Sequence, residues 1–504
     1  MALEDLLRYL LALPRGPLLL LLPLLIPIYK LIRALADPLR TVPGPTVARF
    51  TRLWKLRAFY RGDFEKTNIA LHRKYGKIVR IAPGEYSIDD PSAAKVIYGH
   101  GNNFVKAPWY YAWGSVDPHA ADLFSDLDPA RHAIQRRKYA SAFSMTALLQ
   151  MEQYVDGCTE LLRRRFSEFA ASGERVDVAH WLQCYAFDVV GELTVGKRFG
   201  FLDSGEDISG IIEAINSYLR YGAHVGIYRR LHPLLSRVNQ FLAKGKEGGF
   251  AFIAVFTQRQ IDERLYSGKE TGRQDFLTRF LGLQAQDPEK FTWADVMAGC
   301  TTNIGAGSDT TSISLSSVVY NLWRHPECLK KLREELDGKV DGPVSFRDAQ
   351  EFPYLQAVLK EALRVHPATG LPLVRVVPRG GAMLAGRFFK EGTVVGINSW
   401  VAHNNKVSFG ADADGFRPER WLESKEKSMF MDRNFFAFGM GSRTCIGKHI
   451  SLMEMSKVMP MIVQNFDFEF EGPWTTKNHW FVAQKFRCRV LLRRAQDPSG
   501  TLLG

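Results

Sequence analysis

The chain has 504 residues, of which 46% are hydrophobic and 24% are charged, and its net charge is +13. These values describe an ordinary globular protein with a large core. Six cysteines are scattered without a CxxC pair, which argues against a zinc site and against a disulfide framework. The basic residues form no nucleic-acid-binding motif, so we expect no nucleic acid partner; an acidic protein or anionic lipid fits the charge better.

The N-terminus carries an uncharged apolar run at Gly16–Tyr29, and its 14 residues are few for a membrane span. Flanking arginines can lengthen the segment by placing their charges at the interface. A cleaved secretory signal is the alternative, because Ala34–Ala36 resembles a cleavage site. Lys30 and Arg33 interrupt the path to that site, and positive charge after the apolar run favours an uncleaved segment. The sequence therefore predicts a membrane anchor over residues 1–41.

No linker, low-complexity tract or repeat divides the rest of the chain, so residues 42–504 are predicted to form one large domain. Residues 77–90 predict two short strands around a Pro-Gly turn. Further β-rich segments are expected at 373–397 and near 484–493. Helical periodicity dominates the remainder. The predicted fold is mainly α with small β-sheets.

A long helix is predicted from Thr292 to about Trp323, with Thr292 and Asp295 as a capping pair and Pro326 just beyond its end. At a rise of about 1.5 Å per residue, more than 30 residues cross most of a domain. We therefore expect this helix to be central.

The middle of this helix reads NIGAGSDTTS, which is poor in helix formers. Close packing on a neighbouring helix would explain Gly305 and Gly307. It would not explain Asp309 and Thr310, because a buried carboxylate is costly without a purpose. We predict a functional break in the helical hydrogen-bond ladder here, with room for a ligand and water.

Residues 354–367 carry an apolar stripe at helical spacing, and Glu361 and Arg364 share one face of the predicted helix. Such a pair is usually solvated surface. Arg420, in the stretch FRPERW, is a candidate third member. We predict a buried network of the three, in which the loss of one member costs several kcal/mol (~3–5).

The stretch FAFGMGSRTCIGKH, residues 436–449, combines three glycines with a single cysteine. Gly439, Gly441 and Gly447 allow a positive φ or a close backbone approach. Helical spacing follows Cys445, which places the thiol at the end of a loop where a helix begins. Backbone N–H groups at a helix start stabilise negative charge, so we expect a thiolate that is a metal ligand or a nucleophile.

These motifs, in this order, resemble those of the cytochrome P-450 family of heme-thiolate monooxygenases over essentially the whole chain, with a narrower likeness to microsomal members from filamentous fungi. The matching segments are FGMGSRTCIG (Phe438–Gly447) for the heme loop, AGSDTT (Ala306–Thr311) for the oxygen-binding helix, and Glu361, Arg364 and Arg420 for the structural triad. The resemblance implies the cytochrome P-450 fold, with residues 42–504 as the catalytic domain. It also implies an endoplasmic reticulum membrane protein with a single-pass anchor and a cytosol-facing catalytic domain.

The resemblance implies a b-type heme (heme b) whose iron has Cys445 as its axial thiolate ligand. Phe438 would pack on the cysteine side of the heme, and Arg443 would pair with a propionate. The same resemblance places Gly439 in the heme loop, and Ala306 and Gly307 in the helix above the heme.

Three further residues are candidate propionate partners. Arg375 follows the helix of the structural triad, and Arg136 lies in HAIQRRKYASAF. His132 stands where many family members have tryptophan, and a surface histidine beside a basic helix is the alternative reading of it.

The resemblance assigns proton delivery to Thr310 and Asp309: Thr310 holds an ordered water beside bound O2, and Asp309 links that water to solvent. The chain carries no flavin or nicotinamide motif, so electrons must come from a separate protein. The resemblance implies that this partner is an NADPH-dependent flavoprotein, the cytochrome reductase. A basic dock for that partner is predicted from residues flanking the cysteine side, namely Arg131, Arg136, Arg137, Lys138, Arg433, Lys448 and His449.

Three other classes of protein compete with this interpretation. A hydrolase is disfavoured because GAGSD and GMGSR lack the second glycine of GxSxG. A non-catalytic heme-binding protein would not need Asp309 and Thr310, so their presence argues against it. A heme-thiolate isomerase or dehydratase that does not use O2 stays open as the alternative within the family.

The substrate is expected to be a lipophilic small molecule of fungal secondary metabolism, by analogy with the family. Pocket walls are predicted from 104–125, 297–306, 369–373 and 478–481. An aromatic set could form a lipophilic lid or simply pack within its loop: Phe104, Trp109, Tyr110, Tyr111 and Trp113.

Overall fold

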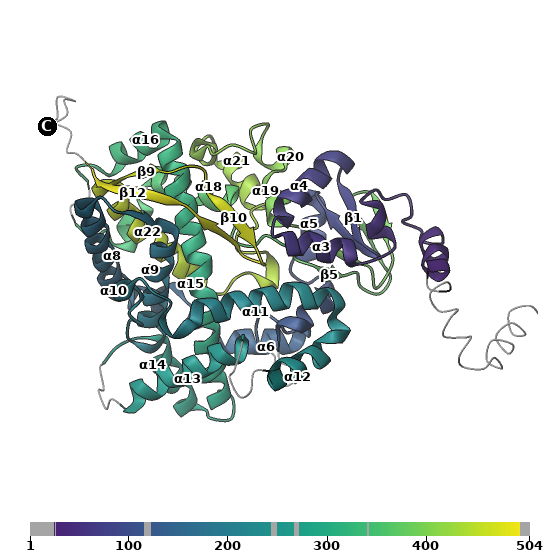
Figure 1. Cartoon of the computed structure of the whole chain (residues 1–504), viewed down its shortest axis with the longest axis horizontal. Helices are drawn as coiled ribbons and strands as arrows, with labels where there is room; N and C mark the ends of the chain where they lie inside the picture. The colour runs from purple at the N-terminus through teal and green to yellow at the C-terminus, as the bar shows by residue number, and fades with distance from the viewer. Residues whose placement is uncertain are drawn as a thin grey trace, which may run out of the picture.

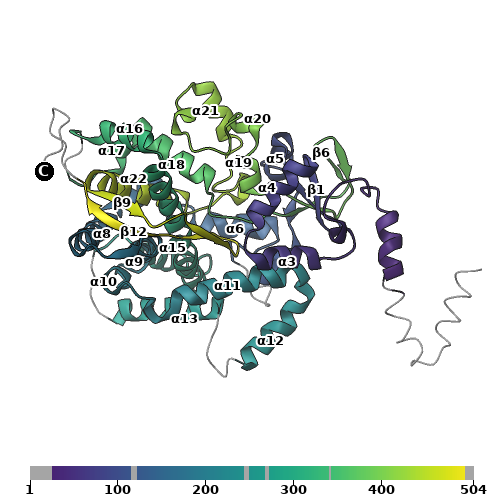
Figure 2. The same cartoon turned by 45° about the horizontal axis from the view of Figure 1, so that its top comes forward.

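The computed structural model describes residues 25–493 apart from 26, 115–121, 243–248, 267–271 and 340–341. Helices make up most of this part of the chain, and its strands form four small sheets. Figures 1 and 2 show most of the helices gathered into one body, with α15 running through its middle. The prediction of a mainly α fold with small β-sheets is confirmed.

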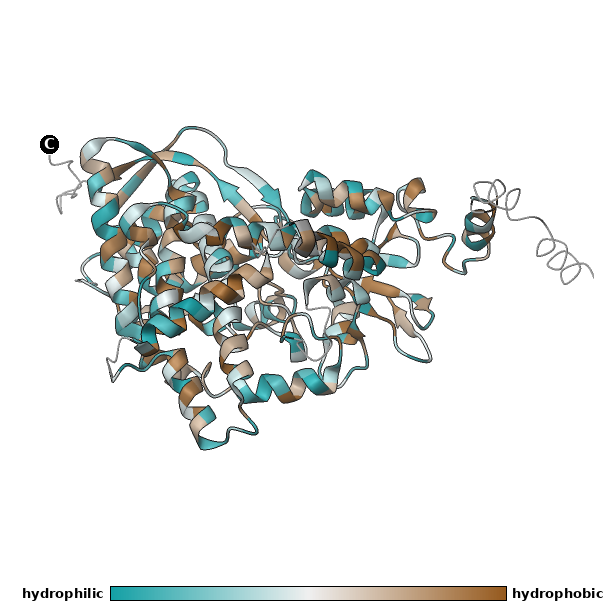
Figure 3. Ribbon diagram, turned by 60° about the horizontal axis from the view of Figure 1, so that its bottom comes forward, coloured by the Kyte–Doolittle hydropathy of each residue, from teal (hydrophilic) through white to brown (hydrophobic). Residues whose placement is uncertain are grey.

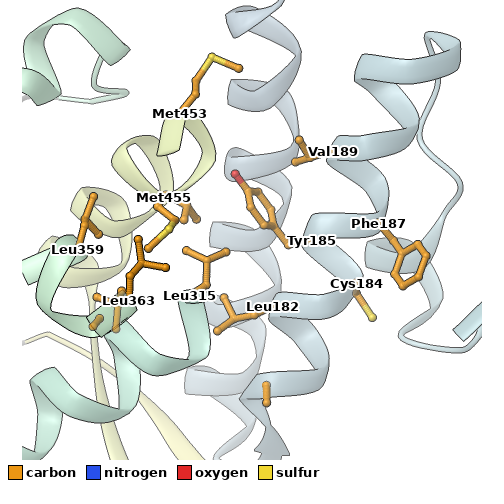
Figure 4. Close-up of a cluster of buried hydrophobic side chains, with 14 of the residues drawn as sticks. Leu182, Cys184, Tyr185, Phe187, Val189, Leu315, Leu359, Leu363, Met453 and Met455 are labelled. Atoms are coloured by element: carbon orange, nitrogen blue, oxygen red, sulfur yellow. The ribbon is translucent and has the colours of Figure 1, made fainter. Parts of the chain in front are cut away.

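Five helices enclose the hydrophobic core. They are α8 (Glu152–Ser172), α9 (Val178–Val195), α15 (Trp293–Arg324), α18 (Pro353–Val365) and α22 (Lys448–Asn465). Figure 4 shows side chains from four of them meeting there, among them Leu182, Tyr185, Leu315, Leu359, Leu363 and Met455. Each of these side chains is buried. Burial of large apolar side chains, worth about 1.5–3 kcal/mol each, holds these helices together.

The central helix α15 begins at the predicted cap. Thr292 Oγ1 accepts a hydrogen bond from the Asp295 backbone N–H, and Asp295 Oδ2 accepts one from the Thr292 backbone N–H. The helix is continuous to Arg324, so the predicted break in its hydrogen-bond ladder is wrong. A Cβ on Gly307 would lie 2.9 Å from Val190 Cγ2 of α9. Close packing against a neighbouring helix therefore explains Gly307, and α15 approaches α9 at that point.

Figure 3 colours the ribbon by hydropathy and shows hydrophobic and hydrophilic residues interspersed along the helices. Apart from the helix at residues 27–35, the remaining described helices lie around this core. They are α3 (Leu53–Arg61), α4 (Phe64–Tyr75), α5 (Pro91–Tyr98), α6 (Pro129–Tyr139), α7 (Met145–Leu149), α10 (Phe201–Ser204), α11 (Ile211–Val225), α12 (His232–Leu242), α13 (Phe250–Tyr266), α14 (Phe276–Gln286), α16 (Pro326–Leu336), α17 (Phe346–Gln350), α19 (Ser399–His403), α20 (Lys406–Phe409) and α21 (Lys425–Asp432), with the 3-10 helices η1 (Thr46–Arg49), η2 (Pro108–Trp113), η4 (Ile208–Gly210), η5 (Gly226–Leu231), η6 (Pro418–Trp421) and η7 (Gly441–Arg443).

The largest sheet has the strand order β1-β2-β8-β5-β3, and three smaller sheets pair β4-β12-β9, β6-β7 and β10-β11. Strands fall in all three predicted segments, but the strands β3, β4, β9 and β10 lie outside them. The bounds are β1 (Ile78–Ala82), β2 (Glu85–Ile88), β3 (Val105–Lys106), β4 (Arg175–Asp177), β5 (Arg375–Val376), β6 (Ala382–Leu384), β7 (Arg387–Phe389), β8 (Val394–Gly396), β9 (Phe466–Phe470), β10 (Thr475–Asn478), β11 (Val482–Lys485) and β12 (Arg487–Leu492).

The predicted anchor over residues 1–41 lies mostly outside the described residues. Residues 27–35 are helical, and this helix stands apart from the body in Figures 1 and 2. Its large apolar side chains are exposed, including Tyr29, Ile32 and Leu35 at about 60% each. Within the described part of the chain, no helix combines the length and the hydropathy of a membrane span.

Candidate functional site

One cavity lies between α15 and the loop that carries Cys445. Its walls come from segments far apart in the sequence, and most of the lining atoms are apolar. Of the residues predicted for the site, the cavity is lined by Cys445, Arg443, Phe438, Gly439, Arg375, Ala306, Gly307 and Thr310. The fold thus brings the cysteine loop opposite the middle of the central helix, as a ligand held between the two requires.

The cysteine loop depends on two of its glycines for its path. Gly439 and Gly441 have φ values of 71° and 67°, which side chains other than glycine rarely adopt. A Cβ on Gly441 would also lie 1.8 Å from the carbonyl oxygen of Tyr98. The loop then turns back, and the Cys445 backbone N–H donates to the Phe438 carbonyl at 2.8 Å. The thiol is therefore held in place by its backbone.

The thiol is less acidic than the sequence suggested. Burial raises the pKa of Cys445, although backbone N–H groups of Gly447 and Lys448 and the charges of Arg136 and Lys448 act in the opposite direction. The expectation of a ready thiolate from the helix start alone is therefore wrong. The backbone N–H groups of Gly447 and Lys448, at the start of α22, favour the anion but do not outweigh the effect of burial. A bound metal cation deprotonates a coordinating thiol outright.

Three cationic side chains line the cavity, and within the described residues none of the three forms a salt bridge with a carboxylate. Arg443 Nη1 is buried and makes no hydrogen bond to the described residues, and burial lowers the pKa of Arg443 to about 10. Arg375 Nη1 donates to the backbone carbonyls of Leu373 and Val374, just before its strand. Lys106 is 7% exposed, and burial followed by the charges of Arg375 and Arg443 lowers its pKa strongly. Such a cluster requires an anion.

Lys106 was not predicted from the sequence as a cationic residue of the site. It lies in the two-residue strand β3, opposite Arg375 in β5, so strand pairing alone brings it to the cavity. Its ammonium group also lies over the ring of Tyr110, at 4.2 Å from the centroid. A strand this short gives no periodic signal. The basic residue within FVKAPWYY was the one available hint.

The other two predicted propionate partners do not line the cavity. His132 and Arg136 lie on α6 and are not among the lining residues. His132 is buried, so its reading as a surface histidine is wrong. Burial, followed by the nearby charges of Arg443, Lys106 and Arg136, lowers the pKa of His132 to about 3. His132 is therefore neutral beside the cationic cluster.

Thr310 and Asp309, neighbours in sequence, point to different places. Thr310 lines the cavity, and its hydroxyl donates to the Ala306 carbonyl at 2.9 Å. Asp309 is 6% exposed, does not line the cavity, and accepts a hydrogen bond from Gln183 of α9 at 2.7 Å. Burial raises the pKa of Asp309 to about 6, and the Gln183 hydrogen bond lowers it only in part.

Glu361, Arg364 and Arg420 form one buried network. Glu361 is fully buried and accepts two hydrogen bonds from Arg364, at 2.8 and 2.9 Å, and one from Arg420 Nε at 3.0 Å. Two further donors were not expected from the sequence. They are the indole N–H of Trp421 at 2.9 Å and the backbone N–H of Arg417 at 2.9 Å.

The predicted cavity walls are present in each of the four segments. Lining residues include Lys106 and Phe124, Thr302 and Asn303, Thr369 and Leu373, and Trp480 and Phe481. Of the five aromatic residues proposed as a lid, Tyr110 lines the cavity. Trp109 and Trp113 pack against Trp480 in the core, with ring centroids 5.4 and 5.5 Å away. Loop packing is therefore the better description of most of that set.

Comparison with known proteins agrees with this geometry. The cytochrome P450 family model matches residues 42–488. Pisatin demethylase from Fusarium vanettenii is 40% identical over 492 residues, covering 95% of this chain and 94% of that protein. A cytochrome P450 monooxygenase from Aspergillus terreus is 38% identical, covering 84% and 89%, and another from Emericella nidulans is 34% identical, covering 91% and 92%.

This chain belongs to the cytochrome P450 family and is a monooxygenase with a heme-thiolate cofactor. The residues of the cavity fit that cofactor. The cations Lys106, Arg375 and Arg443, with the unpaired Nη1 of Arg443, match the two carboxylates of a b-type heme. Cys445 offers a single sulfur ligand between the apolar walls.

The Glu361 network gives a first prediction. Glu361→Ala leaves Arg364 and Arg420 buried without the carboxylate they share, so we expect a loss of about 3–5 kcal/mol in the free energy of unfolding. Urea unfolding followed by fluorescence measures it. Arg417→Ala is the matched control, because its side-chain ion pairs with Asp412 and Glu423 are partly exposed and worth less than about 1 kcal/mol. Equal losses for the two variants would contradict the prediction.

Proposed function

We propose that the protein inserts one oxygen atom of O2 into a lipophilic small molecule, by hydroxylation or a related oxidation, with electrons from an NADPH-dependent reductase. The observation that carries this is a hydroxyl, Thr310, that lines the cavity above Cys445, with the titratable carboxyl of Asp309 next to it in sequence. An isomerase or dehydratase that does not use O2 needs no such proton-handling pair.

The side chains take the following roles in the proposal. Cys445 holds the heme iron through Sγ, and Lys106, Arg375 and Arg443 hold the propionates. When bound, the heme supplies the oxidising chemistry that the side chains lack. Thr310 holds a water toward the cavity in place of its present bond to the Ala306 carbonyl. Asp309 passes protons to that water and regains them from solvent.

The substrate is proposed to be a lipophilic secondary metabolite. The cavity is lined largely by apolar atoms, with Phe124, Phe143, Phe276, Trp480 and Phe481 in its walls. The similar proteins are fungal enzymes, one of them named for demethylation of pisatin. Binding spectra against a panel of such metabolites would identify the compound.

Electrons are proposed to enter from a flavoprotein docked on the cysteine side. Two members of the predicted basic dock already have partners: Arg131 pairs with Asp126 at 2.7 Å and Lys138 with Asp295 at 2.9 Å. Arg136 is half-buried near Cys445. The dock therefore reduces to Arg137, Arg433, Lys448 and His449. Complementary charge there would steer an acidic partner.

We also propose that residues 1–41 anchor the protein in the endoplasmic reticulum membrane, with residues 42–504 as the cytosolic catalytic domain. The exposed apolar side chains of residues 27–35 support this, because water-exposed apolar surface of that extent marks a contact. Lys30 and Arg33, which follow the apolar run, match the charge placement of a cytosolic flank.

The first test of the proposed function concerns heme ligation by the sulfur of Cys445. Purified protein is expected to contain b-type heme, and its reduced carbon monoxide complex is expected to show the red-shifted Soret band of thiolate ligation. Cys445→Ala should abolish that band because no other described cysteine lines the cavity. A variant that keeps the band would overturn the assignment of Cys445.

Thr310→Ala tests the reaction type. The variant is expected to keep its heme and to consume NADPH and O2, but to release roughly tenfold or more peroxide per NADPH, since proton delivery by positioned groups contributes factors of that size or larger. Peroxide and NADPH are measured together with added reductase. Ser308→Ala is the control, because Ser308 also bonds the carbonyl four residues before it but does not line the cavity. Unchanged peroxide release would remove Thr310 from the mechanism.

Deletion of residues 1–41 tests the anchor. The shortened protein is expected to leave the membrane fraction in high salt with its heme content intact, because the site residues all lie beyond the deletion. High salt is needed because it screens attraction between basic surface and anionic lipid but leaves apolar burial intact. Membrane binding that survives would show that another segment anchors the chain.

A further inference from the structure

Asp309 is held away from the cavity that it is proposed to serve. Thr310, Ala306 and Gly307 line the cavity, whereas the Asp309 side chain turns to the seam between α15 and α9. There Gln183 Nε2 donates to Asp309 Oδ1 at 2.7 Å. Within the described part of the chain, Gln183 is the one side chain that bonds this carboxyl.

The two helices meet closely enough to fix this pair. α9 and α15 run antiparallel along the seam, since Gln183 bonds Asp309 while Val190, further along α9, meets the earlier residue Gly307. A Cβ on Gly307 would lie 2.9 Å from Val190, so no side chain fits between the two helices at this point. Gln183 is thereby placed opposite Asp309 by helix packing.

The amide is a weak partner for a carboxylate. It supplies one hydrogen bond and no charge, so burial still raises the pKa of Asp309 to about 6. No charged group contributes to that shift. The titratable neighbours of Gln183 on α9 have their own partners, Cys184 with His180 and Tyr185 with Thr159. The titratable group of α22 on this side is Glu454, which is buried and acts on Tyr185. A lysine or arginine in place of Gln183 would instead hold Asp309 ionised.

We propose that Gln183 is a positioning residue that holds the Asp309 carboxyl in the α9 seam between turnovers and releases it toward Thr310 to deliver a proton. One neutral hydrogen bond fixes the carboxyl's place without fixing its charge. The released carboxyl gives its proton to the water at Thr310 and takes another from solvent, so no other reactant is consumed. This inference rests on the proposed role of Asp309 in proton delivery.

The test measures the protonation of Asp309 directly in the holoenzyme. An infrared titration follows the protonated carboxyl band that is missing in Asp309→Asn. The midpoint is expected at about pH 6 in the unaltered protein. Gln183→Leu should raise it, because the hydrogen bond that favours the anion is lost. Gln183→Lys should lower it by about 1–3 pH units, because an opposite charge favours the anion.

A second measurement follows peroxide release during turnover. Peroxide released per NADPH is measured with reductase and without added substrate. In each variant it is expected to rise as the pH rises through that variant's own infrared midpoint. Gln484→Leu is the control: Gln484 is a buried glutamine that also donates to α15, at the Ile313 carbonyl, but away from Asp309. Gln484→Leu should change neither the infrared midpoint nor the peroxide midpoint. Thermal unfolding of all variants shows whether an effect comes from a loss of folding or from a displaced Asp309 side chain.

Two results would overturn the inference, and they differ. If Gln183→Leu and Gln183→Lys fold but leave both midpoints unchanged, Gln183 does not position Asp309, and the proposed function stands. If Asp309→Asn keeps the pH midpoint of peroxide release seen in the unaltered protein, Asp309 has no part in proton delivery, and the role of Gln183 falls with it. Cys445 and Thr310 are then tested by their own variants.

Discussion

The buried carboxylate of Glu361 is the contact on which the cysteine loop depends. It fixes Arg364 and Arg420, and so joins α18 to the segment around η6. The connection continues through His403, whose carbonyl oxygen accepts from Arg364 and whose Nδ1 donates to the Arg364 carbonyl. His403 Nε2 then accepts the backbone N–H of Phe436, where the loop begins, at 2.7 Å. Burial lowers the pKa of His403 to about 3, so the ring stays neutral and its donor and acceptor stay fixed.

Two faces of the central helix α15 have different roles. One face of α15 presents Ala306 and Thr310 to the cavity, and the other packs on α9 through Gly307 and Asp309. Small residues serve both faces, because they leave room above the cysteine and allow the neighbouring helix to approach. The poor helix formers in NIGAGSDTTS are thus explained without any break in the helix. Packing from both sides supplies the stability that the local sequence lacks.

Motifs with fixed spacing made the fold and much of the site predictable. The capping pair, the long helix, the β-rich segments and the meeting of Glu361 with Arg364 are set by local rules. Contacts across long separations were not predictable: Lys106 reaches the cavity by pairing with Arg375, and Gln183 reaches Asp309 only because two helices pack. The acidity of Cys445 was misjudged for a related reason, since burial depends on the whole fold and not on the helix that follows.

The raised pKa of the Cys445 thiol bears on the life of the chain before its cofactor arrives. Oxidants and disulfides react with thiolates far faster than with protonated thiols. Cys445 is open to solvent in the cavity, so the raised pKa of its thiol, rather than enclosure, is what slows its oxidation during that interval. The surroundings that disfavour ionisation therefore help to preserve the sulfur ligand that Cys445 supplies.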